Sequence, residues 1–263
     1  MTDCANIKML DSHRAFVSVS DAVQSYVNLA DPGDLRFGYT RHARVLVDAL
    51  PAGPVSAVHI GGAGMTIPRY VGFARPESTQ VVFDPDNDLT SRVLDHLPLT
   101  CKGVRIVPRD GRAGLVTCDT KSADLFVLDA FANHQIPADL VTVEFFQRVR
   151  MLLRTSGYGL INAIDHPNAN YVGRVCSSIA AADAGPVTII GPRHQYFGNY
   201  SIVFGSSIDS SPLTDADPGY EVWPAARVTE LVKSSTPLFD ENSMFSPLPP
   251  TETLGEEWTE PAS

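Results

Sequence analysis

One aspartate stands where a catalytic base is expected. Asp129 comes directly after the apolar run "LFVL", so its backbone lies at the end of a buried strand and its carboxylate faces the cleft beyond. A carboxylate in that place acts as a general base or holds a cation. Capping of the next helix is the alternative. The stretch "AFANHQIP" separates Asp129 from that helix and resembles a flexible lid. It therefore favours a role for Asp129 as base or cation ligand over a helix cap.

A glycine-rich turn follows an earlier apolar run. Residues 55–60 read "VSAVHI" and lead into Gly61, Gly62, Ala63 and Gly64. Glycines after the first parallel strand let backbone amides approach a ligand closely, as in nucleotide-binding loops. A tight strand-to-helix turn without a ligand is the alternative. The position after the first strand favours the ligand.

Two further acids end strands of their own. Asp84 closes "TQVVFD" and is placed to accept hydrogen bonds from ribose hydroxyls, or to cap a helix that starts near Asn87. Asp110 and Gly111 follow "GVRIVPR" and are placed to meet the amino group of adenine, or to form a turn.

The histidines and cysteines show no metal-ligand spacing, so no metal site is expected. His134 lies in the lid stretch, where it either touches a substrate or is simply solvated, and His59 lies in an apolar strand as a core residue. Without a CxxC pair, the cysteines are expected to be free thiols in a reducing cytosol; they are Cys4, Cys101, Cys118 and Cys176.

Alternating strands and helices must position these residues. Strands are expected at 55–60, 79–84, 103–111, 123–131, 158–164, 186–191 and 199–206. Helices are expected at 38–50, 66–75, 87–97, 140–154 and 168–182. Such alternation predicts a mostly parallel α/β sheet covered on both faces. The link "PRHQYFG" is too short for a crossover, so the last two strands form an antiparallel hairpin. This is the doubly wound, Rossmann-like plan of S-adenosylmethionine-dependent methyltransferases.

Three parts of the chain are expected. Residues 1–37 hold a β-hairpin at 14–32, residues 38–206 form the Rossmann-like domain, and residues 207–263 form an acidic, proline-rich tail. The tail is expected to form a short helix at 223–233 and to be disordered from 236 onward.

Charge and hydropathy exclude some classes of partner. The net charge is −10, and residues 207–263 hold eleven acidic and two basic residues, a distribution that argues against nucleic acid. No apolar run approaches membrane-spanning length, and the first residues lack a secretory signal, so a cytoplasmic protein is expected.

Taken together, these segments resemble the spermidine synthase family of polyamine aminopropyltransferases, and more closely its actinobacterial spermidine synthase-like branch. The likeness spans residues 21–206 and rests on "DAVQSYVNLADPGDLRFGYTRHARVLVDAL", "HIGGAGMTIPRYV", "VVFDPD", "LDAFANHQIPADLVTVEFF", "LLRTSGYGLINAID" and "FGNYSIVFGS". The resemblance implies transfer of an aminopropyl group from decarboxylated S-adenosylmethionine to putrescine or a related amine. It also implies a homodimer.

The resemblance assigns roles to individual residues. It makes Asp129 the general base that removes a proton from the amine. It places Gln24 in the pocket of the donor and Tyr39 in that of the polyamine, while Asp110 and Gly111 hold adenine. Gly61 and Gly62 align with the start of the glycine-rich loop.

Three acids of the family pattern are replaced. Gly64 takes the place of the aspartate that binds the aminopropyl amine, Val82 that of the ribose-binding glutamate, and Ala132 that of a second acid in the lid. Two alternatives therefore stay open. One alternative to the aminopropyltransferase is a methyltransferase that uses ordinary S-adenosylmethionine. The other is a non-catalytic homologue that keeps the fold for binding or assembly.

Overall fold

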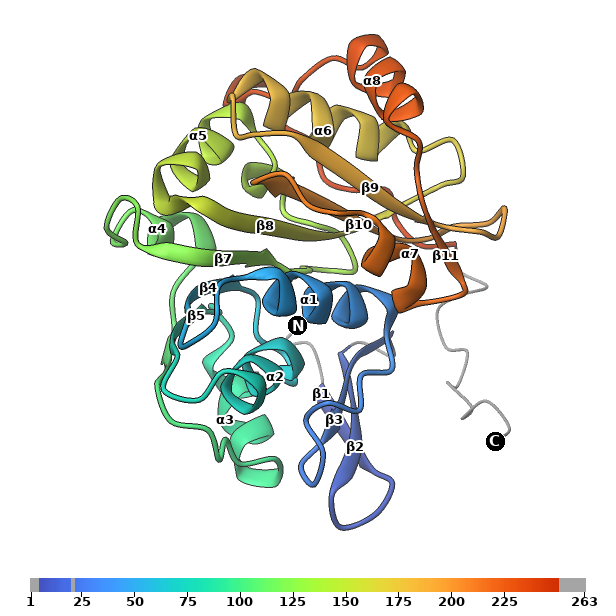
Figure 1. The fold of residues 1–263 in the computed structure, drawn as a ribbon. Helices are drawn as coiled ribbons and strands as arrows, with labels where there is room; N and C mark the ends of the chain where they lie inside the picture. Colours follow the sequence, from blue (N-terminus) through green and yellow to red (C-terminus); the bar gives the residue numbers. More distant parts are fainter. Residues whose placement is uncertain (1–4, 20–21, 251–263) are drawn as a thin grey trace.

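The structure is a computed structural model that describes residues 5–19 and 22–250 (Figure 1). Its centre is an eight-stranded sheet in the order β11-β9-β10-β8-β7-β4-β5-β6. The strands are β4 (Ser56–Ile60), β5 (Thr79–Phe83), β6 (Val104–Val107), β7 (Ala123–Leu128), β8 (Leu153–Asp165), β9 (Val187–Pro192), β10 (Gly198–Gly205) and β11 (Tyr220–Val222).

Strand direction agrees with the plan expected from the sequence. Strands β6, β5, β4, β7 and β8 run parallel, and β10 pairs antiparallel with both β8 and β9. The short link after β9, residues 193–197, forces the chain to reverse, because five residues cannot hold a crossover helix. The methyltransferase-like fold class is confirmed.

Helices cover both faces of this sheet. On one face, α1 (Gly38–Ala49), α2 (Thr66–Ala74) and α7 (Ser211–Ala216) bury one apolar cluster. On the other face, a larger cluster lies beneath α4 (Gly111–Leu115), α5 (Val143–Leu152), α6 (Asn170–Ala181) and α8 (Ala225–Ser234). Figure 1 shows α5, α6 and α8 above the sheet and α1 and α2 below it.

The N-terminal part is larger than the single hairpin expected. Strands β1 (Ala5–Met9), β2 (Arg14–Val19) and β3 (Ala22–Asn28) form a separate antiparallel sheet. Its apolar side packs on α3 (Asn87–His96), where Val17, Val27 and Val93 share a small core. The added strand β1 has only five residues, too few for its pattern to stand out in the sequence.

The C-terminal part differs more from the expectation. Strand β11 joins the edge of the central sheet beyond the boundary expected at residue 206, and α8 agrees with the helix expected at 223–233. Residues 236–250, expected to be disordered, instead pack on the domain, and Leu238 is fully buried. Residues 251–263 lie outside the described residues. Within the described ranges, no helix has the length and apolar character to cross a membrane.

Candidate active site

Strand register brings the predicted site residues to one edge of the sheet. Ile60 pairs with Phe83 on one side and with Leu128 on the other, so residues 61, 84 and 129 leave the sheet at the same level. Beyond that edge lies a cavity, and a smaller one adjoins it. We call these the larger and the smaller cavity.

The glycine loop passes close to the neighbouring strand. Gly61 has φ 88°, and a Cβ there would lie 2.0 Å from the carbonyl oxygen of Asp129. Gly62 donates its amide to the carboxylate of Asp84 over 2.8 Å. Only glycine fits at position 61, since both the positive φ and the contact exclude a side chain. Both glycines line the larger cavity.

Gly64 lies behind this loop. It is buried, and its amide donates to the Ser25 hydroxyl over 3.1 Å. A Cβ at position 64 would lie 2.6 Å from the Cβ of Ser25 and 2.9 Å from Val27. Strand β3 of the small sheet therefore occupies the space that a side chain at position 64 would need, and Gly64 does not line the larger cavity.

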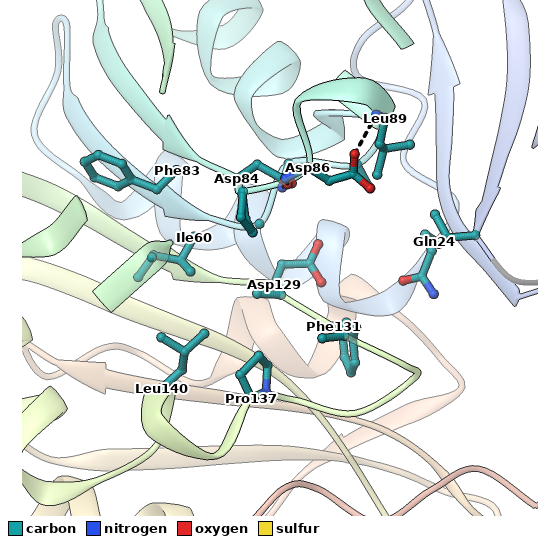
Figure 2. Close-up of a pocket in the computed structure, with 18 of the residues that line it drawn as sticks. Gln24, Ile60, Phe83, Asp84, Asp86, Leu89, Asp129, Phe131, Pro137 and Leu140 are labelled. Carbon is teal, nitrogen blue, oxygen red and sulfur yellow. Dashed lines mark hydrogen bonds between the residues drawn. The ribbon is translucent and has the colours of Figure 1, made fainter. Parts of the chain in front are cut away.

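Two aspartates follow β5, and they play different parts. Asp84 is buried, and its two carboxylate oxygens accept the amides of Gly62 and Asp86 over 2.8 and 2.9 Å. Burial raises the pKa of Asp84, against the opposing effect of those amides. Asp84 thus holds the loop. Asp86, rather than Asp84, caps α3 by accepting the amide of Leu89 over 2.8 Å, and its carboxylate faces the larger cavity (Figure 2).

Asp110 and Gly111 also line the larger cavity, at the start of α4. Asp110 caps this helix by accepting the amide of Ala113 over 2.9 Å. A Cβ at position 111 would lie 2.2 Å from Cγ2 of Ile60, so glycine lets the helix approach β4. Asp110 and Gly111 thus begin a short helix at the cavity wall, and the contact with adenine stays a prediction.

Asp129 is fixed by a chain of hydrogen bonds. Asn162 Nδ2 donates to Asp129 Oδ1 over 2.8 Å, and Asn199 Nδ2 donates to Asn162 Oδ1 over 2.8 Å. The Tyr39 hydroxyl donates to the same carboxylate. Burial raises the pKa of Asp129, and the hydrogen bonds from Asn162 and Tyr39 oppose that rise. A carboxylate held in this way is oriented and has a heightened affinity for a proton.

The two cavities meet at Asp129. Gln24, Asp129, Phe131 and His134 line both, whereas Tyr39 lines only the smaller one. Burial, followed by the charge of Asp129, raises the pKa of Tyr39 well above its usual value, so its hydroxyl keeps its proton and donates. Figure 2 shows Gln24 and Asp129 on opposite sides of the space between the elements.

The lid stretch forms a tight turn. Ala132 and Gln135 exchange backbone hydrogen bonds of 2.8 and 3.0 Å. Between them, Asn133 and His134 have φ values of 50° and 63°. Positive φ at both central residues is the mark of a type I′ turn. The turn therefore holds His134 on the cavity wall.

Two histidines are buried in the core. Burial lowers the pKa of both His42 and His59 to about 4, so both are neutral at pH 7. His59 Nε2 lies 3.0 Å from Gln80 Oε1, in agreement with its expected core role. In the ranges that the structure describes, no three His, Cys, Asp or Glu side chains gather closely enough to hold a metal ion.

The polar residues of the site that were not singled out from the sequence include Ser25, Asp86, Asn162 and Asn199. A polar residue in the apolar run "LINAI" is the signal that points to Asn162. Asn199 lies at the start of β10, beside it. Asp86 carries no comparable signal, because an acid before a helix is read first as a cap.

Comparison with known proteins shows which proteins this chain is similar to. No protein-family model matches the chain. Over 148 residues it is 30% identical to the polyamine aminopropyltransferase of Neisseria meningitidis, a match that covers 54% of this chain and 55% of that protein. Over that half of its length, the chain is similar to the polyamine aminopropyltransferases. It spans about half the length of the curated relatives it matches.

Solved structures of spermidine synthases share the fold of this chain. A probable spermidine synthase from Corynebacterium glutamicum superposes with a TM-score of 0.80 at 20% identity, over 90% of this chain and 92% of that one. A spermidine synthase in complex with the transition state analogue AdoDATO gives 0.57 at 16% identity, over 81% and 77%. The resemblance to the spermidine synthase family is thus confirmed, and its actinobacterial branch stays a prediction.

Proposed function

We propose that this chain is an aminopropyltransferase that carries an aminopropyl group from decarboxylated S-adenosylmethionine to an amine such as putrescine. One observation carries the proposal. The carboxylate of Asp129, oriented by Asn162 and Tyr39, stands where the two cavities join. A donor in the larger cavity and an acceptor in the smaller one would meet beside it.

The charge of the cavities favours a decarboxylated donor. Four aspartates line the larger cavity, and the described residues that line either cavity include neither lysine nor arginine. Decarboxylated S-adenosylmethionine carries two positive charges, on its sulfonium and its amine. Ordinary S-adenosylmethionine adds a carboxylate, which these walls would repel and leave without a cationic partner.

The chemistry needs one proton acceptor. The amine enters protonated, since its pKa lies near that of lysine. It gives one proton to Asp129, and its freed lone pair attacks the carbon beside the sulfonium. The carbon–sulfur bond breaks with its electron pair going to sulfur, which leaves as a neutral thioether. The new carbon–nitrogen bond makes a secondary ammonium. A base with a raised pKa is suited to the first step, because its proton affinity is closer to that of the amine.

The donor's adenosyl end is assigned by position. We infer that Asp110 and Gly111 lie beside adenine and that Asp86 accepts the ribose hydroxyls. Asp84 is less suited, because both of its oxygens already accept backbone amides. Asp86 in this role would offset the acid that Val82 replaces. Gln24, which reaches both cavities, is the group we place beside the donor's aminopropyl chain.

Calorimetry tests the donor before any turnover is assumed. We expect decarboxylated S-adenosylmethionine to bind at least about tenfold more tightly than S-adenosylmethionine, a difference of about 1.4 kcal/mol, and methylthioadenosine to bind as the product. Putrescine should then yield spermidine, with no loss of activity in EDTA. Tighter binding of S-adenosylmethionine would instead indicate a methyltransferase, and binding of none of the three would indicate a non-catalytic homologue.

Two further properties are proposed from the family relationship alone. We infer a homodimer and a cytoplasmic location. Light scattering coupled to size-exclusion chromatography tests the first, since a mass near 28.4 kDa would show a monomer. Fractionation of the source cells tests the second.

A further inference from the structure

The chain after α8 crosses α6, α5 and α4 and reaches the site at Pro249. We call residues 235–250 the C-terminal segment. It first lies on α6, where the Ser178 hydroxyl accepts the amide of Leu238 over 2.8 Å. Leu238 then accepts the amide of Val143, at the start of α5, over 2.7 Å. Leu238 is fully buried, so this end of the segment is anchored in the core.

A second anchor ties the segment to the wall of the larger cavity. Asp240 forms an ion pair with Arg112, in which Nη1 lies 2.7 Å and Nη2 2.5 Å from the carboxylate. Arg112 follows Gly111 directly and also donates to the carbonyl of Asp139 over 2.9 Å. The guanidinium thus joins α4, the 3-10 turn Ala138–Leu140 that follows the lid, and the C-terminal segment.

The segment then pairs with the lid itself. The hydroxyl of Ser246 accepts the amide of Ile136 over 2.9 Å, and the amide of Ser246 donates to the carbonyl of Ile136 over 3.4 Å. The Gln135 side chain donates to the Ser246 carbonyl. Ser246 and Ile136 are both buried. The type I′ turn that carries His134 is therefore held from behind by Ser246.

Three residues further on, the segment reaches the smaller cavity. Pro249 lines that cavity together with Tyr39 and Asn162, which are distant from it in the sequence. Pro249 does not line the larger cavity. Its neighbour Leu248 is 58% exposed. The segment thus presents one side chain to the cavity and the next to solvent.

We propose that the C-terminal segment is part of the acceptor site: Ser246 is a positioning residue for the lid, and Pro249 is a wall that sets which amines fit. The second part rests on the proposed function, because it takes the smaller cavity as the acceptor's place. The first part does not, since the pairing with the lid exists whatever the cavity binds.

Hydrogen exchange tests Ser246 without any substrate. In Ser246→Ala the amide of Ile136 loses its acceptor, and we expect its exchange to accelerate at least tenfold while the amides of β7 are unchanged. Ser234→Ala, in a serine whose hydroxyl donates to the carbonyls of Glu230 and Leu231 within α8, is the matched control. Unchanged exchange at Ile136 would overturn the role of Ser246, whether or not the protein proves to be an aminopropyltransferase.

A pair of tryptophan variants tests Pro249. Putrescine is titrated into protein saturated with methylthioadenosine, so that binding is read without turnover. Pro249→Trp should weaken putrescine at least tenfold and leave methylthioadenosine unchanged, while Leu248→Trp should change neither. Equal effects of the two variants, or an effect on methylthioadenosine alone, would overturn the role of Pro249. Failure of the unaltered protein to bind methylthioadenosine would instead refute the proposed function, with the exchange experiment still deciding the role of Ser246.

Discussion

The carboxylate of Asp129 is buried. Because burial disfavours the charged form, it raises the pKa of Asp129. The folded chain therefore holds this proton to a higher pH than the unfolded chain does. The stability from that extra proton affinity is greatest at low pH and is lost as the pH rises through the folded pKa. At neutral pH and above, the charged carboxylate of Asp129 lowers the stability of the fold. The proposed chemistry requires this charged form.

The substitution Asp129→Asn separates the role of Asp129 in catalysis from its effect on stability. The amide keeps the shape of the side chain and still accepts from Asn162, but it cannot take a proton from the amine. We expect aminopropyl transfer to fall at least about 100-fold, as for loss of a general base. The thermal midpoint at pH 8 should exceed that of the unaltered protein by a few degrees, with the gap closing toward pH 4. Activity assays and melts across this range check both expectations, and a lower midpoint at pH 8 would contradict the second.

Asp86 gives a prediction about the donor. Asp86→Asn keeps the cap of α3, because asparagine caps helices as well as aspartate does, but it removes the charge from the cavity wall. Charge-assisted hydrogen bonds are worth about 1.5–3 kcal/mol, so we expect methylthioadenosine to bind at least about tenfold more weakly by calorimetry. Asp88→Asn, in the exposed first turn of the same helix, is the control. Equal affinities of the two variants would remove Asp86 from the site.

Single residues also show how far the sequence could be read. Asp129 was predictable because an apolar run fixes a strand, and the residue after a parallel strand faces the cleft. The division of labour between Asp84 and Asp86 was not predictable. It depends on where the amide of Gly62 points, and that direction is set by strands distant in the sequence.

At the scale of elements, the turn after β4 depends on glycine for two distinct reasons. Gly61 and Gly53 both have positive φ, but a Cβ at Gly61 would overlap the Asp129 carbonyl, whereas one at Gly53 would meet nothing within 4 Å. Gly53→Ala should cost about 1–2 kcal/mol, the strain of that backbone region. Gly61→Ala should cost clearly more and weaken methylthioadenosine binding as well. Chemical denaturation of both variants measures the difference. Equal losses would show that the backbone relieves the overlap.

The strands that could be predicted were those marked by an apolar run in their own sequence. The strands from 55 to 206 are apolar runs, and their order follows from parallel pairing and one short reversal. β11 has three residues, and its place is set by pairing with β9 rather than by any pattern of its own. Type I′ geometry at Asn133 and His134 was also hidden, because histidine is not a typical residue for the second central position.

The whole molecule explains why residues 236–250 were expected to be disordered and are not. Composition measures how much apolar surface a segment can bury by itself. It does not measure what the rest of the molecule offers, here the contacts with α5 and α6 that hold the buried Leu238. Proline adds to the effect, since it removes the segment's own hydrogen bonds without hindering bonds to other elements.

We therefore expect the chain through residue 250 to unfold as one unit, with the C-terminal segment contributing to its stability. Leu238→Ala removes a fully buried side chain and should lower the free energy of unfolding by about 2–5 kcal/mol. Leu248→Ala, in the same segment but 58% exposed, should change it by less than about 0.5 kcal/mol. Guanidinium unfolding followed by far- and near-ultraviolet circular dichroism measures both, and the two signals should fall together. An early, separate transition, or equal losses from the two substitutions, would show that the segment rests on the domain without being part of its core.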